Sequence, residues 1–418
     1  MKHPNAPIDK SIFERIALVV VILGLLVWFI PLSKAGGDFK IYMEAAAKLA
    51  MSQDPYAPPF THGLGYSYGL IFAAALVPFA HFPEVAAYLW LVLQVACLAR
   101  SWGILEKWLT KSSPDSKRVV RLALIVSTIW MSRFLVYNFR MVQVTPFLLW
   151  AALEAWHQAS NEKGLWANGI LALGIATKIL PILLLPCWIV KAHRKSVVWT
   201  AAFLSVWIAL PCLFWGWENV LEWNKSWWNV INPGQSQYVV NTETNAQTIA
   251  GILSALSKEN VGLLTQDSVG IASQAMRLSV FFAVLFRLWQ NRRNINDKNY
   301  PRQWVRELGI MCITIPLLFP HQQKYAFLFA FPAIVYLVLW LLERDWKTTN
   351  QSTSSYLWVV CVGLGLMTFS PLIGSDIIGR ETYTMLLNAK ILGLGTFMLL
   401  VCLLFNVGSG IDRRRLPN

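Results

Sequence analysis

The sequence is poor in charge, because only 14% of its 418 residues are charged whereas 56% are hydrophobic. A soluble domain has about a quarter of its residues charged, so this composition excludes a water-soluble enzyme and indicates that a bilayer is the main solvent. The six cysteines show no paired spacing. A disulfide framework and a cysteine-based metal site are therefore not indicated.

Acidic residues are also scarce, with 22 Asp and Glu against 36 Lys and Arg, which gives a net charge of +14. Such an excess can indicate nucleic-acid binding, but here the basic residues lie in short loops between apolar runs. This placement is typical of a topology signal in a membrane protein. We therefore expect membrane lipids, and no nucleic acid, as partners.

Twelve apolar runs predict an all-α polytopic membrane protein with about twelve transmembrane helices. They fall near 12–32, 84–105, 119–137, 143–157, 165–179, 180–190, 196–215, 271–289, 304–319, 325–342, 354–373 and 387–405. Another run, 67–82, is predicted to be a juxtamembrane or re-entrant helix on the outer side, because every basic loop then faces the cytoplasm. The first run lacks a cleavage signal after it and is interpreted as a retained span. Both short runs, 165–179 and 180–190, are expected to be broken helices.

The predicted topology describes one membrane domain with both termini cytoplasmic. Residues 1–345 are expected to form its main module, with long outer segments at 33–83 and 216–270. Residues 346–418 add C-terminal helices and a basic cytoplasmic tail. Polar residues other than the topology charges gather on the outer side, which predicts an extracytoplasmic site.

The segment after the first span is unusually polar. Gly36 and Gly37 allow a sharp turn, and the periodicity at 40–51 predicts a helix whose apolar face carries Ile41, Ala45 and Leu49. The opposite face carries a charged row at spacing i, i+4: Lys40, Glu44 and Lys48. Asp38 stands at the start of this helix, where it can be an N-cap or a general base.

Five motifs follow one another along the chain: 38–42 with 54–58, 140–146, 174–181, 241–245 and 319–321. In order and spacing they resemble the GT-C glycosyltransferases, which take a sugar from a polyprenyl-phosphate carrier. Within that group the chain most resembles glycosyltransferase family 87, the polyprenol-phosphate-mannose-dependent mannosyltransferases. One departure is visible, because the family often has a Gly-Gln pair where this chain has Met141-Val142-Gln143. The resemblance implies a GT-C fold, a polyprenyl-phosphate sugar donor and a glycolipid or glycan acceptor. It also implies that residues 1–345 are the catalytic module and that the protein lies in the inner (plasma) membrane of a bacterium.

The chemistry of such a transfer requires a base for the acceptor hydroxyl and cations for the donor phosphate. The resemblance implies that Asp38 is the base. Lys178 and His321 are predicted to hold the phosphate, and Arg140 and Lys324 are plausible further cations. Phosphate leaves without protonation by a second carboxylate. Gly37 and Phe39, which flank Asp38, supply no second carboxylate for a metal site of the DxD type, so we expect no metal and no cofactor.

Amide and aromatic side chains are predicted to contact the sugar or the acceptor, because amides pair with hydroxyls and sugar C–H edges stack on rings. The candidates are Asn241, Asn245, Gln143, Tyr42 and Tyr56. Arg133, inside an apolar run, is interpreted as a packing or snorkelling residue. Two alternatives stay open: a transporter or flippase of lipid-linked sugars, which the lack of an internal repeat disfavours, and an O-antigen-type polymerase or ligase.

Overall fold

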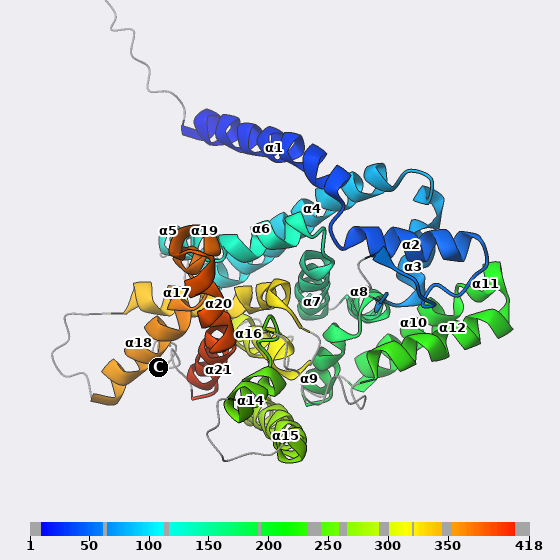
Figure 1. Ribbon diagram of the computed structural model, residues 1–418. Helices are drawn as coiled ribbons and strands as arrows, with labels where there is room; N and C mark the ends of the chain where they lie inside the picture. Colours follow the sequence, from blue (N-terminus) through cyan, green and yellow to red (C-terminus); the bar gives the residue numbers. More distant parts are fainter. Residues whose placement is uncertain are drawn as a thin grey trace, which may run out of the picture.

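The computed structural model describes residues 10–61, 65–112, 117–161, 163–190, 194–232, 244–258, 266–291, 301–319, 322–344 and 353–405. Within these ranges every regular element is a helix, which confirms the predicted all-α class (Figure 1). The first half contains α1 (Lys10–Ala35), α2 (Phe39–Ala50), α3 (Leu70–Leu76), η2 (Val77–Phe79), α4 (Pro83–Ser112), α5 (Lys117–Trp130), α6 (Ser132–Arg140), α7 (Thr145–Ser160), α8 (Gly164–Thr177), η4 (Leu180–Leu183), α9 (Leu184–Val190) and α10 (Arg194–Ala209). The second half contains α11 (Cys212–Trp215), α12 (Trp217–Ile231), α14 (Ile249–Lys258), α15 (Gln266–Gln290), α16 (Pro301–Leu318), η5 (Lys324–Ala330), α17 (Phe331–Glu343), α18 (Thr353–Met367), η6 (Pro371–Ile373), α19 (Ser375–Ile378), α20 (Arg380–Asn388) and α21 (Ile391–Leu404).

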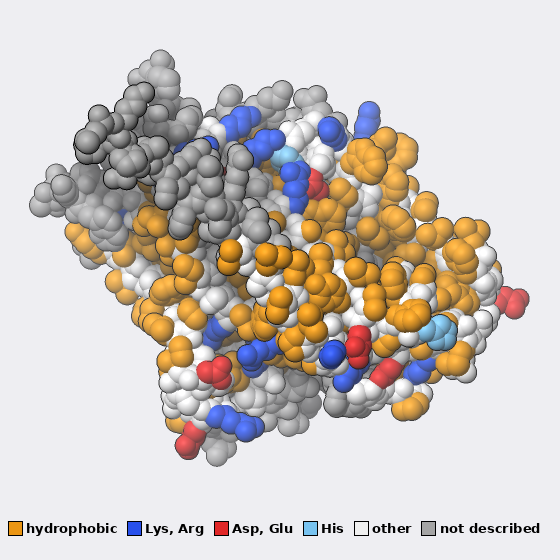
Figure 2. Space-filling model, turned by 90° about the horizontal axis from the view of Figure 1, so that it is seen from above, with side chains coloured by type: hydrophobic (Ala, Val, Ile, Leu, Met, Phe, Trp, Pro, Cys, Tyr) orange, Lys and Arg blue, Asp and Glu red, His pale blue; other side chains and the backbone are white. Residues whose placement is uncertain are grey.

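Several helices are suited to a bilayer. Among the described residues, four are long and apolar enough to cross a membrane: Pro83–Lys111, Lys195–Trp215, Ser268–Gln290 and Lys324–Glu343. The pairs α5–α6 and α20–α21, bent by 54° and 52°, raise this number to six if each pair is one span. Apolar side chains cover much of the coloured surface in Figure 2. The chain is therefore a multi-pass membrane protein, and the count of twelve spans stays a prediction.

The helices are arranged in two groups around a central pair (Figure 1). Helices α2, α3, α10 and α12 lie on one side, and α17, α18, α20 and α21 lie on the other. Between them, α7 packs against α4 and α8, while α16 packs against α17 and α21. This packing brings the start of α2, the α6–α7 turn and the end of α8 close to one another.

The turn between α1 and α2 follows the glycine prediction. Gly36 and Gly37 have φ of +70° and +47°, which side chains rarely adopt. A Cβ at Gly37 would lie 2.7 Å from the Cα of Met141, so this close approach requires glycine. The Asp38 N–H donates to the carbonyl of Met141 over 3.0 Å. Asp38 is thus fixed by its backbone to the α6–α7 turn.

Helix α2 confirms the predicted apolar face, because Ile41, Ala45 and Leu49 are all buried. Two side chains of its charged row, Glu44 and Lys48, also contact the segment that follows α2. Glu44 accepts a hydrogen bond from the Thr61 N–H at 2.9 Å, and the Lys48 Nζ lies 3.8 Å from the Phe60 ring centroid. The row therefore holds the segment before residue 61 against α2.

The segment 67–82 forms only α3 and η2. Seven residues of α-helix are about 10 Å long, too short to cross a bilayer, which agrees with the predicted non-spanning helix. The predicted break between the short runs is also present: α8 ends at Thr177 and Lys178 is extended, with φ −153° and ψ 129°. The Gly69 N–H donates to the Thr177 carbonyl at 3.0 Å, which places Tyr68 beside Lys178.

Candidate functional site

Asp38 occupies the N-cap position of α2, yet its side chain makes no capping hydrogen bond. Instead its Oδ2 accepts a hydrogen bond from the Gln143 Nε2 in the turn between α6 and α7. The residue is half-buried. Its carboxylate is thus held by another element, which separates it from an ordinary helix cap.

Gln143 connects Asp38 to a group of buried tyrosines. The Tyr42 and Tyr68 hydroxyls each lie 3.3 Å from the Gln143 Oε1, and the Tyr42 hydroxyl donates to that of Tyr68 at 2.7 Å. The Lys178 Nζ donates to the same Tyr68 hydroxyl at 3.4 Å. We name these five residues (Asp38, Tyr42, Tyr68, Gln143 and Lys178) the polar cluster. It links the predicted base to the predicted cation by hydrogen bonds.

The tyrosines of the polar cluster remain neutral phenols at neutral pH. Burial raises the pKa of Tyr42 well above its usual value, and the neighbouring Tyr68 hydroxyl and Asp38 carboxylate raise it further. Burial likewise raises the pKa of Tyr68. Both hydroxyls therefore keep the proton that a hydrogen-bond donor needs.

Lys178 is a buried cation with 8% of its surface exposed. Its Nζ lies 4.6 Å from the ring centroid of Tyr68 and 5.3 Å from that of Tyr325. Asp38 is the carboxylate whose charge acts on it, and no described carboxylate forms an ion pair with it. A lone ammonium between aromatic rings is suited to an incoming anion.

An apolar cavity of about 530 Å³ adjoins the polar cluster. It lies between α3, α4, α8 and α10, and its lining includes Phe72, Trp90 and Thr177. The Trp90 Nε1 donates to the Gln143 carbonyl at 3.3 Å, and Thr177 precedes Lys178 in the chain. Two of the residues that line the cavity, Trp90 and Thr177, therefore adjoin the polar cluster.

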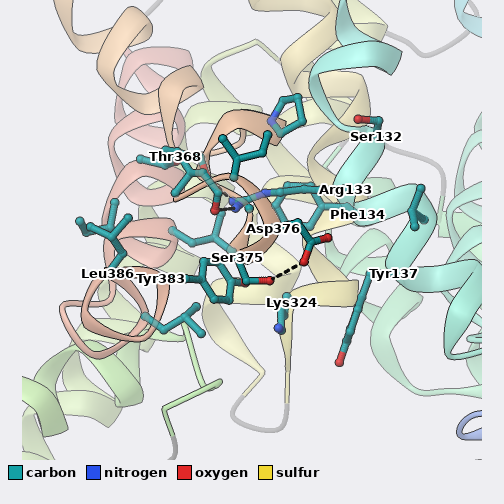
Figure 3. Close-up of a pocket in the computed structure, with 18 of the residues that line it drawn as sticks. Ser132, Arg133, Phe134, Tyr137, Lys324, Thr368, Ser375, Asp376, Tyr383 and Leu386 are labelled. Atoms are coloured by element: carbon teal, nitrogen blue, oxygen red, sulfur yellow. Dashed lines mark hydrogen bonds between the residues drawn. The ribbon is translucent and has the colours of Figure 1, made fainter. Parts of the chain in front are cut away.

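Arg140 and Lys324 both line a second cavity, of about 300 Å³, between α6, η5, α19 and α20. Figure 3 shows Lys324 between Tyr137 and Tyr383, with Asp376 above it and Arg133 above Asp376. The structure thus joins Lys178 to Asp38 through Gln143 and Tyr68, and it places Arg140 and Lys324 in a cavity of their own.

The other predicted site residues have different surroundings. Tyr56 is buried, and its hydroxyl donates to the Tyr68 carbonyl at 3.0 Å, so it supports the polar cluster. Asn245 is exposed in a turn before α14. Asn241 and His321 lie outside the described residues. The sugar-contact and phosphate roles of these residues stay predictions.

Sequence reasoning missed Tyr68, Tyr137 and Tyr325. A signal was present for Tyr68, because Tyr66-Ser67-Tyr68 is a polar interruption directly before an apolar helix. Arg133 was expected to pack, and its guanidinium does bond to the carbonyls of Ile373 and Thr368, but it also lines the second cavity.

The sequence model of glycosyltransferase family 87 matches residues 66–313. The chain belongs to glycosyltransferase family 87. Among curated proteins no sequence matches it. The matched range contains Tyr68, Gln143 and Lys178, whereas Asp38 and Lys324 lie outside it.

In this family 87 glycosyltransferase, the polar cluster combines a carboxylate, neutral hydroxyl donors and a buried cation. A carboxylate can take a proton from a hydroxyl, and a cation with an O–H donor can stabilise an oxyanion. Gln143 joins the Asp38 carboxylate to the hydroxyls of Tyr42 and Tyr68. These are the parts that sugar transfer from a donor to an acceptor requires.

Replacing Gln143 by leucine is expected to lower the transfer rate about tenfold to a hundredfold, because about 1–3 kcal/mol of hydrogen bonding to buried groups is lost. The loss of an amide donor to the Asp38 carboxylate should also raise the pKa of that carboxyl, so the acid limb of the pH–rate profile should move to higher pH. Steady-state rates from pH 5 to 9 measure both effects.

Gln94→Leu is the matched control, because Gln94 is fully buried in α4 and neither of its amide atoms is bonded within the described residues. This variant should keep the wild-type rate and pH profile. A Gln143→Leu enzyme within twofold of wild type, with an unshifted profile, would contradict the positioning role.

Proposed function

We propose that this protein is an inverting hexosyltransferase that moves a sugar from a polyprenyl-phosphate donor to a glycolipid or glycan acceptor. Mannose is the hexose that the family resemblance favours. One observation carries the proposal: the hydrogen-bonded polar cluster joins Asp38 to Lys178 beside an apolar cavity. A base, a phosphate site and a lipid site thus adjoin one another.

The reaction follows from this arrangement. The Asp38 carboxylate removes the proton of the acceptor hydroxyl while its oxygen attacks the anomeric carbon. The bond from that carbon to the phosphate oxygen breaks, and its electron pair goes to the phosphate. Lys178 and the Tyr68 hydroxyl stabilise the growing negative charge. The proton ends on Asp38, and the anomeric configuration is inverted because attack and departure are on opposite faces.

The apolar cavity is assigned to the first isoprene units of the donor. Its lining includes Leu89, Leu93 and Phe214, whose side chains are also exposed on the outside of the molecule. A carrier lipid can therefore enter sideways from the bilayer. An apolar lining matches an isoprenoid chain, and Lys178, which follows the lining residue Thr177 in the chain, matches its phosphate.

We propose that the site faces away from the cytoplasm, in a bacterial plasma membrane, and that both termini are cytoplasmic. The distribution of basic loops supports this orientation. We also propose that transfer requires no metal, because Lys178 supplies the cation that the leaving phosphate needs. His321 and Asn241 keep their proposed contacts to phosphate and sugar.

The direct test uses the purified protein in detergent with radiolabelled polyprenyl-phosphate mannose and a lipid extract from a deletion strain. The label should move from the donor to a new product, with and without EDTA. An intact donor in detergent, together with movement of that donor across reconstituted vesicles, would favour the flippase alternative and contradict the proposal.

A further inference from the structure

The second cavity carries more positive than negative charge. Its lining includes Arg133, Arg140 and Lys324, against the single carboxylate of Asp376. Figure 3 shows Arg133, Lys324 and Asp376 around it. The Asp376 Oδ1 accepts a hydrogen bond from the Ser375 Oγ at 3.3 Å. Three cations and one carboxylate in about 300 Å³ leave two positive charges to be balanced.

None of these cations forms an ion pair within the part of the chain that the structure describes. The Arg133 guanidinium donates only to neutral carbonyls, those of Ile373 and Thr368. The Lys324 Nζ lies over two rings, 5.0 Å from the centroid of Tyr137 and 5.2 Å from that of Tyr383. Arg140 is exposed. The cavity therefore offers unbalanced charge to a ligand.

This cavity reaches Asp38 by a different route from Lys178. Arg140 precedes Met141, whose carbonyl accepts from the Asp38 N–H. The Tyr137 ring, which lines the cavity, stacks on the Tyr325 ring with an interplanar angle of 11°, and Tyr325 in turn faces Lys178. The charge of Asp38 acts on both Tyr137 and Lys178. Asp38 is thus within electrostatic range of both Lys178 and the wall of the second cavity.

We propose that the second cavity binds an anionic group of the acceptor, a phosphate or a carboxylate, so that the acceptor is an anionic glycolipid. The inference rests on the proposed function, which assigns the donor phosphate to Lys178 and its lipid to the apolar cavity. The donor carries one phosphate, which Lys178 binds in the proposed function, so the cations of the second cavity are left for another anion. Arg140 and Lys324 are then acceptor-binding residues instead of donor-binding ones, and the tyrosine rings beside them can stack on the acceptor sugar.

The charge of the reaction product tests this inference. Radiolabelled product made by the purified wild-type protein, with lipid extract from a deletion strain as acceptor, is freed of donor by mild acid and applied to an anion exchanger. The labelled lipid should bind and elute with salt. A neutral product that passes through the column overturns the inference and leaves the proposed function intact.

The double variant Arg140→Gln/Lys324→Gln tests the place of binding. The amount of acceptor extract needed for half the maximal rate should rise about tenfold or more, because charge-assisted hydrogen bonds are lost, while the value for the donor changes less than twofold. Lys225→Gln, an exposed lysine of α12 outside both cavities, is the control. An unchanged requirement for acceptor in the double variant overturns the assignment.

Native mass spectrometry with phosphatidylglycerol and diacylglycerol separates the acceptor from an ordinary bilayer lipid. Wild type should retain phosphatidylglycerol in preference to diacylglycerol, and the double variant should not. Loss of phosphatidylglycerol with an unchanged acceptor requirement assigns the cavity to bilayer lipid and overturns the proposal. Absence of any labelled product contradicts the proposed function. In that case mass spectrometry still tests the cavity, because equal retention of diacylglycerol and phosphatidylglycerol by the wild type contradicts anion binding.

Discussion

Replacing Asp38 by asparagine is expected to lower the rate of sugar transfer about 10²- to 10⁴-fold, which is the range for loss of a general base. The amide cannot take the proton of the acceptor hydroxyl. Its oxygen can still accept the hydrogen bond from Gln143, and the backbone bond to Met141 is unaffected, so the fold should persist. Initial rates with labelled donor, together with thermal unfolding in detergent, measure the two expectations.

Glu44→Gln is the control for this variant. Glu44 is a carboxylate of the same helix, α2, but it accepts hydrogen bonds from Thr61 and has no contact with the polar cluster among the bonds of the described residues. Its rate should stay within about threefold of wild type. An Asp38→Asn enzyme with a tenth or more of the wild-type rate, at equal folding, would remove Asp38 from the role of base.

Replacing Lys178 by methionine is expected to lower kcat/KM for the polyprenyl-phosphate donor about 10²- to 10³-fold, as for loss of one group that stabilises a developing oxyanion. Methionine has a similar length and no charge. Removing an unpaired buried cation also removes its desolvation cost, so the midpoint of thermal unfolding should stay constant or rise. Lower activity with undiminished stability distinguishes a functional lysine from a structural one.

Lys390→Met is the matched control, because Lys390 is also buried and its Nζ donates to the carbonyl of Thr244 at 3.2 Å. Lys390→Met is expected to show the opposite result. Its thermal stability should fall, while its transfer rate should stay within about threefold of wild type. If Lys178→Met and Lys390→Met lose stability alike and keep activity alike, Lys178 has only a packing role.

The helices could be predicted from the sequence because a bilayer leaves each backbone polar group to be satisfied within its own segment. Each predicted apolar run accordingly falls on a helix or on a broken helix pair. The bend of 54° between α5 and α6 could not be foreseen. No proline marks Met131, and the bend depends on packing between distant segments, such as the bond from Trp130 to the Leu366 carbonyl.

Candidate site residues could be predicted where a single polar side chain interrupts an apolar stretch. Asp38 and Lys178 stand out against apolar neighbours, and both lie in the polar cluster. The sequence could not separate Lys324 from Lys178, because which cavity a cation lines depends on tertiary packing. The sequence also did not predict the backbone conformation of Val142, which directly precedes Gln143. Val142 is buried and β-branched, and its φ is +48°. The glycine that the family often has there adopts this conformation without strain.

The polar cluster consists only of residues between Asp38 and Lys178, whereas the walls of the second cavity include residues from Lys324 to Leu392. Because a chain is synthesised and folded from its N-terminus, Asp38 and Lys178 can meet while the last helices have not yet left the ribosome. The hydrogen bonds of the polar cluster can thus form before the second cavity is complete, since that cavity also needs η5 and α20. A nascent chain of this protein is expected to acquire the Asp38–Lys178 part of its proposed site before the place proposed for the acceptor.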